Sequence, residues 1–505
     1  MNYRNSFLAG AIMTLVPSAL SYCAQVNNDR KENDGGLAGK DSRPNILFIV
    51  SEDNGPELGC YGAPVKTPNL DRLASEGVMF KNAYVTQAGS SPSRSSFLTG
   101  LYPHQNGQVG LATWDYSMYQ EDTPNLVNDL KKSGYRTGMI GKLHVLPESS
   151  FSFDWWEIRG SNFQRNKLDR YANDAYQFIK ESEAPFYLQV NYPDAHNPFI
   201  PQVDGHPETV LTGNDVEALP YMGLTSDSLR QKTADYYNCI ARLDEWIGVL
   251  LEKLKESGKY DNTMIVYIGD HGADILRGKR TCYEGGLKIP LIISWSGGVK
   301  NSVYQHLIST IDLYPTFMEL SGNPIPSYLP GKSLMKVVKG SMKPVREFLF
   351  TEYHVHSNDN PYPQRAVRNK QYKLIYNPVA DYENPGYNFT IHHFVNPDDF
   401  TDALGRAPQI VRDAYERMRK PPEYELYDLK KDPYEFNNLA GNPKYNKILN
   451  NLKKALYGWQ VATKDPFLDK EIAERFFVEV MNTNNQKIEI KYHDYMDPHL
   501  VLIPR

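Results

Sequence analysis

Cysteine is scarce in this chain. Its 505 residues include only four cysteines, at positions 23, 60, 239 and 282. They show neither the close pairs of a zinc site nor the density of a disulfide framework. Cys60 and Cys282 could lie near one another in the fold, but the sequence does not show that they do.

A long hydrophobic run is also missing. The apolar run from Phe7 to Leu20 is too short to cross a bilayer as a helix, so no transmembrane span is predicted. No internal repeat or coiled-coil heptad is evident. The net charge of −5 is small for this length and gives no reason to expect nucleic-acid or membrane-surface binding. An anionic ligand would therefore have to be met by a local cationic site.

The N-terminal segment is typical of an exported protein. Arg4 precedes the apolar run, as in a secretory signal peptide, which we place at residues 1–23. Cys23 ends a loose match to a bacterial lipoprotein box, with a bulky Tyr22 where a small residue is expected, so lipid attachment stays open. Residues 24–43 are polar and predict a flexible tether. We expect a periplasmic or lipid-anchored surface protein of a bacterium.

Apolar runs that end in polar residues recur in the first part of the chain. Runs at residues 45–50, 186–191 and 264–268 predict buried parallel strands. They alternate with segments of helical spacing, such as the long segment from Leu229 to Ser257. This alternation predicts an α/β sandwich around a mostly parallel sheet, which we assign to residues 44–352. Ligands of such sheets bind outside the carboxyl ends of the strands.

The pattern changes after about residue 353. Residues 365–377 and 424–429 alternate like antiparallel strands, and residues 445–461 have the pattern of a helix. We therefore predict a smaller C-terminal α+β domain with an antiparallel sheet, over residues 353–505.

The most distinctive motif runs from Ser90 to Gly100. It places a hydroxyl shortly before a fixed cation, Arg94, with Pro92 stiffening the turn between them. Leu98-Thr99-Gly100 is typical of the end of a short helical segment. A Ser-rich surface loop is the alternative interpretation of such a string.

The motif resembles the signature of the type I sulfatases, Cys/Ser-x-Pro-x-Arg followed by Leu-Thr-Gly. The resemblance implies an alkaline-phosphatase-like sandwich for the larger domain. It also implies that Ser90 is oxidised after translation to formylglycine, with Arg94 as the cation that holds it.

Acidic residues at two predicted strand ends suit a divalent cation. Glu52 and Asp53 follow the first strand, and Asp270 and His271 follow a later one. Hard carboxylate oxygens favour calcium or magnesium over zinc. By the resemblance these four residues, together with the modified side chain of Ser90, match the family's metal ligands, although the family usually has Asp in the place of Glu52 and often Asn in the place of His271. We expect calcium, with magnesium as the open alternative.

The resemblance also assigns the residues that meet the sulfate. Lys142 and Lys279 match the family's sulfate-binding lysines, with Arg280 as an alternative to Lys279, and His144 matches an active-site histidine. A cation and these lysines would stabilise negative charge that grows on a sulfate ester or sulfamate. The hydrated aldehyde would supply one hydroxyl to attack sulfur and a second whose deprotonation expels sulfate. His196 would protonate the leaving group.

Several stretches narrow the resemblance to the N-sulfoglucosamine sulfohydrolases, the heparan N-sulfatases. They are His104-Gln105-Asn106-Gly107, Gly141-Lys142-Leu143-His144-Val145, Pro363-Gln364-Arg365-Ala366-Val367-Arg368 and Glu425-Leu426-Tyr427-Asp428. The implied partner is a sulfated saccharide, and we expect exo-action on N-sulfated glucosamine of heparan or heparin. We expect His354 and Arg365 to contact the saccharide, whereas His356 is equally compatible with a hydrogen bond at the domain interface.

Three alternatives stay open. A carbohydrate O-sulfatase of the same family would act on another sulfated glycan. A phosphatase or phosphodiesterase of the related superfamily would have no need of Pro92 and Arg94, and a non-catalytic sulfoglycan-binding protein would leave Ser90 unoxidised. Because the motif has serine at its first position, we expect a radical-type maturase that works without oxygen as a partner. The sequence leaves the oligomeric state open.

Overall fold

Two β-sheets lie within the described residues, and the larger one has a parallel centre. The computed structural model describes residues 41–483 and residue 486, so the predicted signal peptide, Cys23 and nearly all of the tether lie outside the described residues. The strands of the larger sheet are β1 Asn45–Ser51, β2 Gly77–Tyr84, β3 Arg136–Ile140, β4 Trp155–Glu157, β5 Phe186–Tyr192, β6 Thr263–Gly269, β7 Lys288–Ile289, β8 Leu291–Ser294 and β9 Ser302–Ser309.

These strands run in the order β4-β3-β5-β1-β6-β8-β2-β7, and β9 pairs with β2. From β4 to β6 every neighbouring pair is parallel. β8 is antiparallel to both β6 and β2, so β2 runs in the same direction as β6. The carboxyl ends of the central strands and of β2 therefore lie at the same edge of the sheet.

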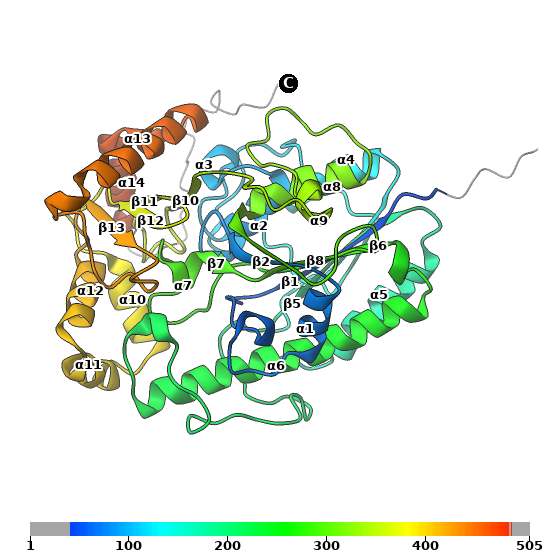
Figure 1. Cartoon of the computed structure of the whole chain (residues 1–505), viewed down its shortest axis with the longest axis horizontal. Helices are drawn as coiled ribbons and strands as arrows, with labels where there is room; N and C mark the ends of the chain where they lie inside the picture. Colours follow the sequence, from blue (N-terminus) through cyan, green and yellow to red (C-terminus); the bar gives the residue numbers. More distant parts are fainter. Residues whose placement is uncertain (1–40, 484–485, 487–505) are drawn as a thin grey trace, which may run out of the picture. The chain divides into compact units, whose positions relative to one another are not determined.

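Helices cover both faces of this sheet (Figure 1). On one face α1 (Pro68–Ser75) and α5 (Asp169–Glu181) pack against the long α6 (Asp227–Glu256). On the other face α2 (Ser90–Thr99), α4 (Leu126–Lys132) and α8 (Leu313–Leu320) pack together. The short helices α3 (Pro103–Asn106), α7 (Glu284–Leu287) and α9 (Met335–Val338) lie in the connections. The predicted α/β sandwich is confirmed.

The long helix α6 forms where the spacing of apolar residues predicts it. The side chain of Ser226 caps its N-terminus by accepting a hydrogen bond from the backbone N–H of Leu229 at 3.2 Å. Ile240, Leu243 and Ile247 recur at helical spacing and are completely or almost completely buried. One face of α6 therefore joins the core and the other faces solvent.

The smaller sheet is antiparallel, as predicted. It consists of β10 (Leu349–Tyr353), β11 (Gln364–Arg368), β12 (Tyr372–Tyr376) and β13 (Tyr424–Asp428), in that order. It begins shortly before the predicted domain boundary at residue 353. α13 (Asn446–Thr463) packs on β11 and β12. The remaining helices of this part are α10 Pro385–Phe394, α11 Pro397–Arg406, α12 Gln409–Arg419 and α14 Lys470–Asn482.

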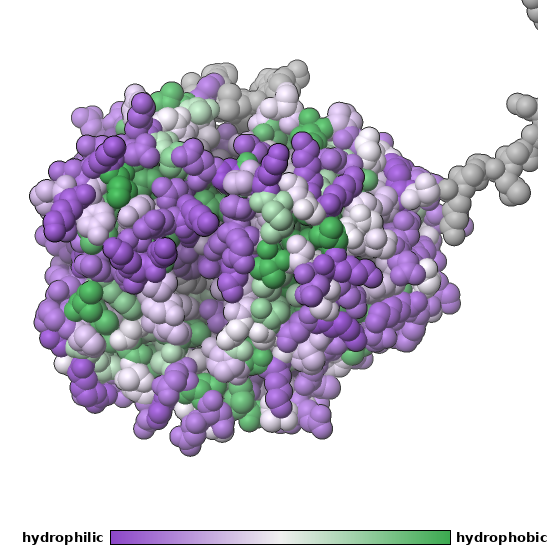
Figure 2. All heavy atoms as spheres, in the orientation of Figure 1, coloured by the Kyte–Doolittle hydropathy of each residue, from purple (hydrophilic) through white to green (hydrophobic). Residues whose placement is uncertain are grey.

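No disulfide joins the cysteines within the described residues. Cys60, Cys239 and Cys282 are free thiols, so Cys60 and Cys282 are not joined. No helix within residues 41–483 is both long and apolar enough to span a bilayer. Hydrophilic residues cover most of the face shown in Figure 2, where hydrophobic residues form separate patches. The fold therefore rests on burial of apolar surface between sheets and helices.

Candidate active site

Polar residues at the ends of four adjacent strands meet at one edge of the larger sheet. β3, β5, β1 and β6 are consecutive neighbours and parallel. Lys142 and His144 follow β3, His196 follows β5, Glu52 and Asp53 follow β1, and Asp270 and His271 follow β6. The sheet thus gathers residues that lie far apart in the sequence.

Ser90 enters this group from α2. It is the first residue of that helix, all ten residues of which are buried. The Oγ of Ser90 lies 3.2 Å from the Nε2 of His271. The helix ends at Thr99, where the sequence predicts it, and Gly100 has a φ of 71°, a left-handed conformation that glycine adopts at little steric cost.

Arg94 joins the acidic residues of the site. Its Nε donates to Asp270 at 3.1 Å and its Nη2 donates to Glu52 at 3.2 Å. Its Nη1 donates to the backbone oxygen of Lys142 at 3.1 Å and to the side chain of Asn191 at 2.8 Å. Since each guanidinium nitrogen already has an acceptor and the group is completely buried, Arg94 positions the carboxylates and does not face open space.

Two lysines balance the remaining negative charge. The Nζ of Lys142 lies 2.9 Å from Glu52, and the Nζ of Lys279 lies 3.1 and 3.2 Å from the two oxygens of Asp53. Burial by itself would raise the pKa of Glu52, but the charges of Lys142 and Arg94 outweigh it and hold that pKa at about 2. Three buried carboxylates therefore face three buried cations.

The orientation of His271 indicates a cation site. Its Nδ1 lies 2.8 Å from the carbonyl oxygen of Gly272, which can only accept, so Nδ1 donates this hydrogen bond and Nε2 is the ring atom directed to the cluster. That Nε2 lies 3.2 Å from an oxygen of Asp53 and 3.7 Å from one of Asp270. Electron-pair donors that converge in this way are stabilised by a shared cation, and a carbonyl partner for Nδ1 is the usual support of a ligating histidine. The donor set fits the predicted divalent ion.

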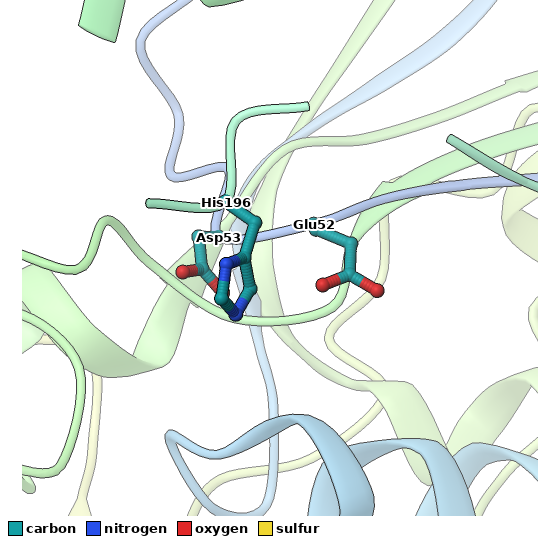
Figure 3. Close-up of side chains that lie close together, drawn as sticks. All are labelled: Glu52, Asp53 and His196. Atoms are coloured by element: carbon teal, nitrogen blue, oxygen red, sulfur yellow. The ribbon is translucent and has the colours of Figure 1, made fainter. Parts of the chain in front are cut away.

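A second group of donor atoms adjoins the first. Atoms of Glu52, Asp53 and His196 that could bind a metal lie within 4.8 Å of one another, and Figure 3 shows the three side chains directed to the same space. The Nδ1 of His196 lies 2.6 Å from the carbonyl oxygen of Asn197, and burial lowers the pKa of His196. The ring is therefore held at Nδ1, with Nε2 as the atom left for the site.

The backbone of the site is strained at several residues. Asp53, His144 and Arg280 have φ values of 49°, 59° and 69°, a region that is costly for residues with a side chain. Neither ring nitrogen of His144 has a hydrogen-bond partner among the described residues. Burial, with the charge of Lys142, lowers the pKa of His144 well below its usual value. Strain and unpartnered buried polar atoms are typical of a site that a ligand completes.

The structure contradicts the substrate contact predicted for Arg365 and His354. The guanidinium of Arg365 is completely buried and binds both oxygens of Asp465 at 2.7 Å. The ring of His354 is also completely buried, lies 3.3 Å from Glu352 and packs on Phe467. Both residues hold the smaller sheet against the C-terminal segment, because their partners lie in the interior.

His356 is the residue of this segment that lies beside the site. Its Cδ2 is 3.9 Å from the place that a Cβ would take on Gly89, the residue before Ser90. Both of its ring nitrogens lack a partner within the described part of the chain, and burial, with the charges of Lys279 and Arg280, lowers its pKa well below the usual value. No sequence signal separates His356 from His354, since both follow the same strand.

Asn191 is a site residue that the sequence analysis did not identify. Its side chain accepts from Arg94 and donates to the carbonyl oxygen of Ile140 at 3.0 Å. It lies near the end of a strand whose residues are all buried. The sequence signal that could have identified Asn191 is a polar residue within an otherwise apolar strand.

Comparison with protein families decides the assignment. The family model described as Sulfatase matches residues 44–323, which is more than half of the chain. The chain belongs to the sulfatase family. A second family model, N-sulphoglucosamine sulphohydrolase C-terminal, matches residues 269–384 of this sulfatase.

Individual relatives agree with this assignment. The human N-sulphoglucosamine sulphohydrolase is 29% identical over 471 residues, covering 85% of this chain and 92% of the human protein. An ulvan-active sulfatase from Formosa agariphila is 31% identical over 435 residues, covering 84% of this chain and 81% of that protein. The crystal structure of the sulfatase homologue yidJ from Bacteroides fragilis has a TM-score of 0.68 at 25% identity, covering 86% of this sulfatase and 99% of yidJ. The predicted family and fold are therefore confirmed.

Proposed function

We propose that this sulfatase hydrolyses sulfate groups of sulfated glycans, with the terminal N-sulfated glucosamine of heparan-type chains as its substrate. The observation that carries the proposal is the buried cluster of carboxylates, lysines and an arginine, which the hydroxyl of Ser90 joins through His271. Two comparisons support this sugar. A human relative bears the name N-sulphoglucosamine sulphohydrolase, and the C-terminal model of that enzyme matches residues 269–384.

We assign a divalent cation, calcium by preference, to the acidic cluster. Its ligands would be Glu52, Asp53, Asp270, His271 and the side chain of residue 90. A set dominated by carboxylate oxygens suits calcium or magnesium. When bound, the ion would supply positive charge that stabilises negative charge growing on the sulfate oxygens. Because the carboxylates and cations of the protein balance, this excess charge is what an anionic substrate requires.

The nucleophile is proposed to be formylglycine, made from Ser90 by a radical-type maturase. Its hydrate is a better nucleophile than a serine hydroxyl. The position at the start of α2 places it at a helix N-terminus, where unsatisfied N–H groups favour negative charge. Arg94, on the same helix, fixes Asp270 and Glu52 relative to residue 90.

The sulfate oxygens are assigned to Lys142 and Lys279, which reach the cluster from the segments after β3 and β6. His196 is assigned to protonate the leaving group, because its Nδ1 is held by Asn197 and its Nε2 is turned to the site. His144 has no protein partner at either ring nitrogen among the described residues, so an oxygen of the substrate can serve as one.

His356 is assigned to contact the saccharide from the side of the smaller sheet. Its unpartnered ring nitrogens and its place beside Gly89 support this role. It takes the place of Arg365, whose guanidinium binds Asp465, and of His354, whose completely buried ring lies 3.3 Å from Glu352 through Nε2.

The experiment combines mass spectrometry with a substrate panel. Protein from the native host should show, in the peptide that contains Ser90, the loss of two hydrogens that marks oxidation of an alcohol to an aldehyde. That protein should release sulfate from N-sulfoglucosamine, whereas protein made without a maturase should keep Ser90 and release little. Full activity of unmodified protein would refute the formylglycine assignment.

A carbohydrate O-sulfatase is the second candidate, because the 31% identical relative from Formosa agariphila is named as active on ulvan. The same panel separates the two. Release of sulfate from an O-sulfated monosaccharide, with none from N-sulfoglucosamine, would refute the proposed substrate. The assignment as a sulfatase would still hold.

A further inference from the structure

A large cavity lies apart from the residues around Ser90. Its volume is about 1350 Å³, larger than the ~300–1,000 Å³ of most small-ligand sites. Its walls come from β2, β7 and β9 of the larger sheet and from β11, β12 and the segment after β13. None of its lining residues is assigned to the cation, the sulfate or the leaving group. We call this cavity the intersheet groove.

Lysines without a carboxylate partner line the intersheet groove. They are Lys288, Lys332, Lys370 and Lys430. Within the described residues none of these ammonium groups forms an ion pair, and Lys332 donates only to the backbone oxygen of Val345, at 3.2 Å. Lys288 is the least exposed of the four, and burial lowers its pKa. An anion bound beside Lys288 would stabilise its charged form.

The acidic side chains of the groove do not cancel this charge. Glu284 is already paired with Arg368 at 2.7 Å and with Lys373 at 3.2 Å. Burial raises the pKa of Glu57 to about 7, which weakens its negative charge near neutral pH. Glu347 is exposed to solvent. The groove therefore keeps an excess of positive charge, which is what an anionic ligand requires.

Tyrosine rings accompany the lysines. Tyr434 lines the groove and is 38% exposed, and Tyr372 on β12 also lines it and is partly exposed. A tyrosine presents a flat apolar face and a polar hydroxyl. A sugar ring has the complementary form, with an apolar face and hydroxyl groups around its edge.

We propose that the intersheet groove is a second saccharide-binding site, which holds an acidic glycan chain apart from the residues that cleave sulfate. Unpaired lysines recognise the acidic groups of the chain, and the tyrosines contact its sugar rings. The volume of the groove suits several sugar units. This inference rests on the proposed action on sulfated glycans, and either sulfate or carboxylate groups of the chain could supply the negative charge.

The test uses full-length protein with unmodified Ser90, so that the ligand is bound and not cleaved. The groove variant is Lys370→Glu/Lys430→Glu, because both side chains are exposed and their change should leave the fold intact. The control variant is Lys180→Glu/Lys454→Glu, which makes the same charge change at exposed lysines outside the groove. Calorimetry with a heparin-derived octasaccharide at two salt concentrations measures binding.

We expect the groove variant to bind the octasaccharide at least tenfold more weakly than the wild type and the control, with a smaller dependence on salt. Binding of the monosaccharide N-sulfoglucosamine should be the same in all three proteins. In addition, the octasaccharide should shield Lys370 and Lys430 of the wild type from acetylation but leave Lys180 reactive. Equal weakening by both variants, or no shielding of Lys370 and Lys430, would overturn the proposal.

A hyaluronan octasaccharide, which has carboxylates but no sulfate, identifies the source of charge. If hyaluronan binds as tightly as the heparin chain, carboxylates are sufficient for binding to the groove. If it binds much more weakly, the groove recognises sulfate groups. Because the measurement needs no turnover, it stands even if the matured enzyme does not cleave N-sulfoglucosamine. Conversely, if that monosaccharide is cleaved normally but no oligosaccharide binds in the groove, only the proposal of a second saccharide-binding site is refuted.

Discussion

At the residue scale, adjacent cations differ in their nearest carboxylate. Lys279 lies 3.1 Å from Asp53 and 3.7 Å from Asp274, whereas Arg280 pairs with Asp274. On matured enzyme we expect Lys279→Ala to lose roughly 2–4 kcal/mol of transition-state stabilisation, as removal of one oxyanion donor does, which is about 30- to 900-fold in kcat/KM. Arg280→Ala should cost less, because its partner lies outside the proposed ligand set. The measurement is kcat/KM for a small aryl sulfate, with the melting temperature as the control for folding. A larger loss of kcat/KM in Arg280→Ala than in Lys279→Ala would assign sulfate binding to Arg280.

Glu57 provides a pH dependence away from the acidic cluster. Burial raises its pKa from 4.5 to about 7, although Tyr236, which donates to it at 3.1 Å, and the nearby Lys288 act in the opposite direction. A carboxyl whose pKa is raised on folding stabilises the fold below its unfolded pKa, and this contribution is lost as pH rises to the folded value. Because Glu57 is partly exposed, we expect Glu57→Gln to gain about 1–2 kcal/mol on the wild type between pH 5 and pH 8. Urea unfolding measures the difference, and a constant gap across this range would contradict the assignment.

At the element scale, the contact between Arg365 and Asp465 ties β11 to the segment after α13. Removal of one member of a buried ion pair leaves the other charge uncompensated, so Arg365→Ala should lower the free energy of unfolding by about 3–5 kcal/mol. The double variant Arg365→Met/Asp465→Leu should recover much of that loss. Denaturant unfolding tests both variants. A raised KM for saccharides with unchanged stability would instead restore the predicted substrate contact.

Part of the fold and of the site could be predicted from the sequence. The position of the site at one edge of the larger sheet was predictable, because apolar runs such as residues 45–50 and 264–268 identify parallel strands, whose carboxyl ends lie at the same edge. The partner of Arg365 was not predictable, since Asp465 lies 100 residues further along the chain and only packing brings them together. The role of His356 could not be separated from that of His354 for a similar reason. Residue type and spacing indicate strands, whereas the direction of one side chain depends on tertiary contacts.

At the scale of the whole molecule, the proposed calcium site joins distant segments. Its ligands follow β1 and β6 and begin α2, so the unfolded chain lacks the site. An ion that binds only the folded state stabilises it, by about 2.7 kcal/mol at a hundredfold excess over Kd. We expect chelation to lower the melting temperature of unmodified protein and added calcium to restore it. Asp53→Ala should lose this response to calcium, whereas the control Asp122→Ala, at an exposed position, should keep it. An unchanged melting temperature after exhaustive chelation would refute the proposed calcium site.

The burial of α2 has a consequence for the order of events in the cell. Ser90 is only 1% exposed, and the helix that begins there is buried along its whole length. A maturase has to bring its own reactive groups into contact with the Cβ of Ser90, which the folded chain prevents. The proposed conversion of Ser90 would therefore have to precede folding, while the chain is still extended. The yield of active enzyme would then depend on the relative rates of modification and folding, and we expect a chain that folds first to keep Ser90 and to stay inactive.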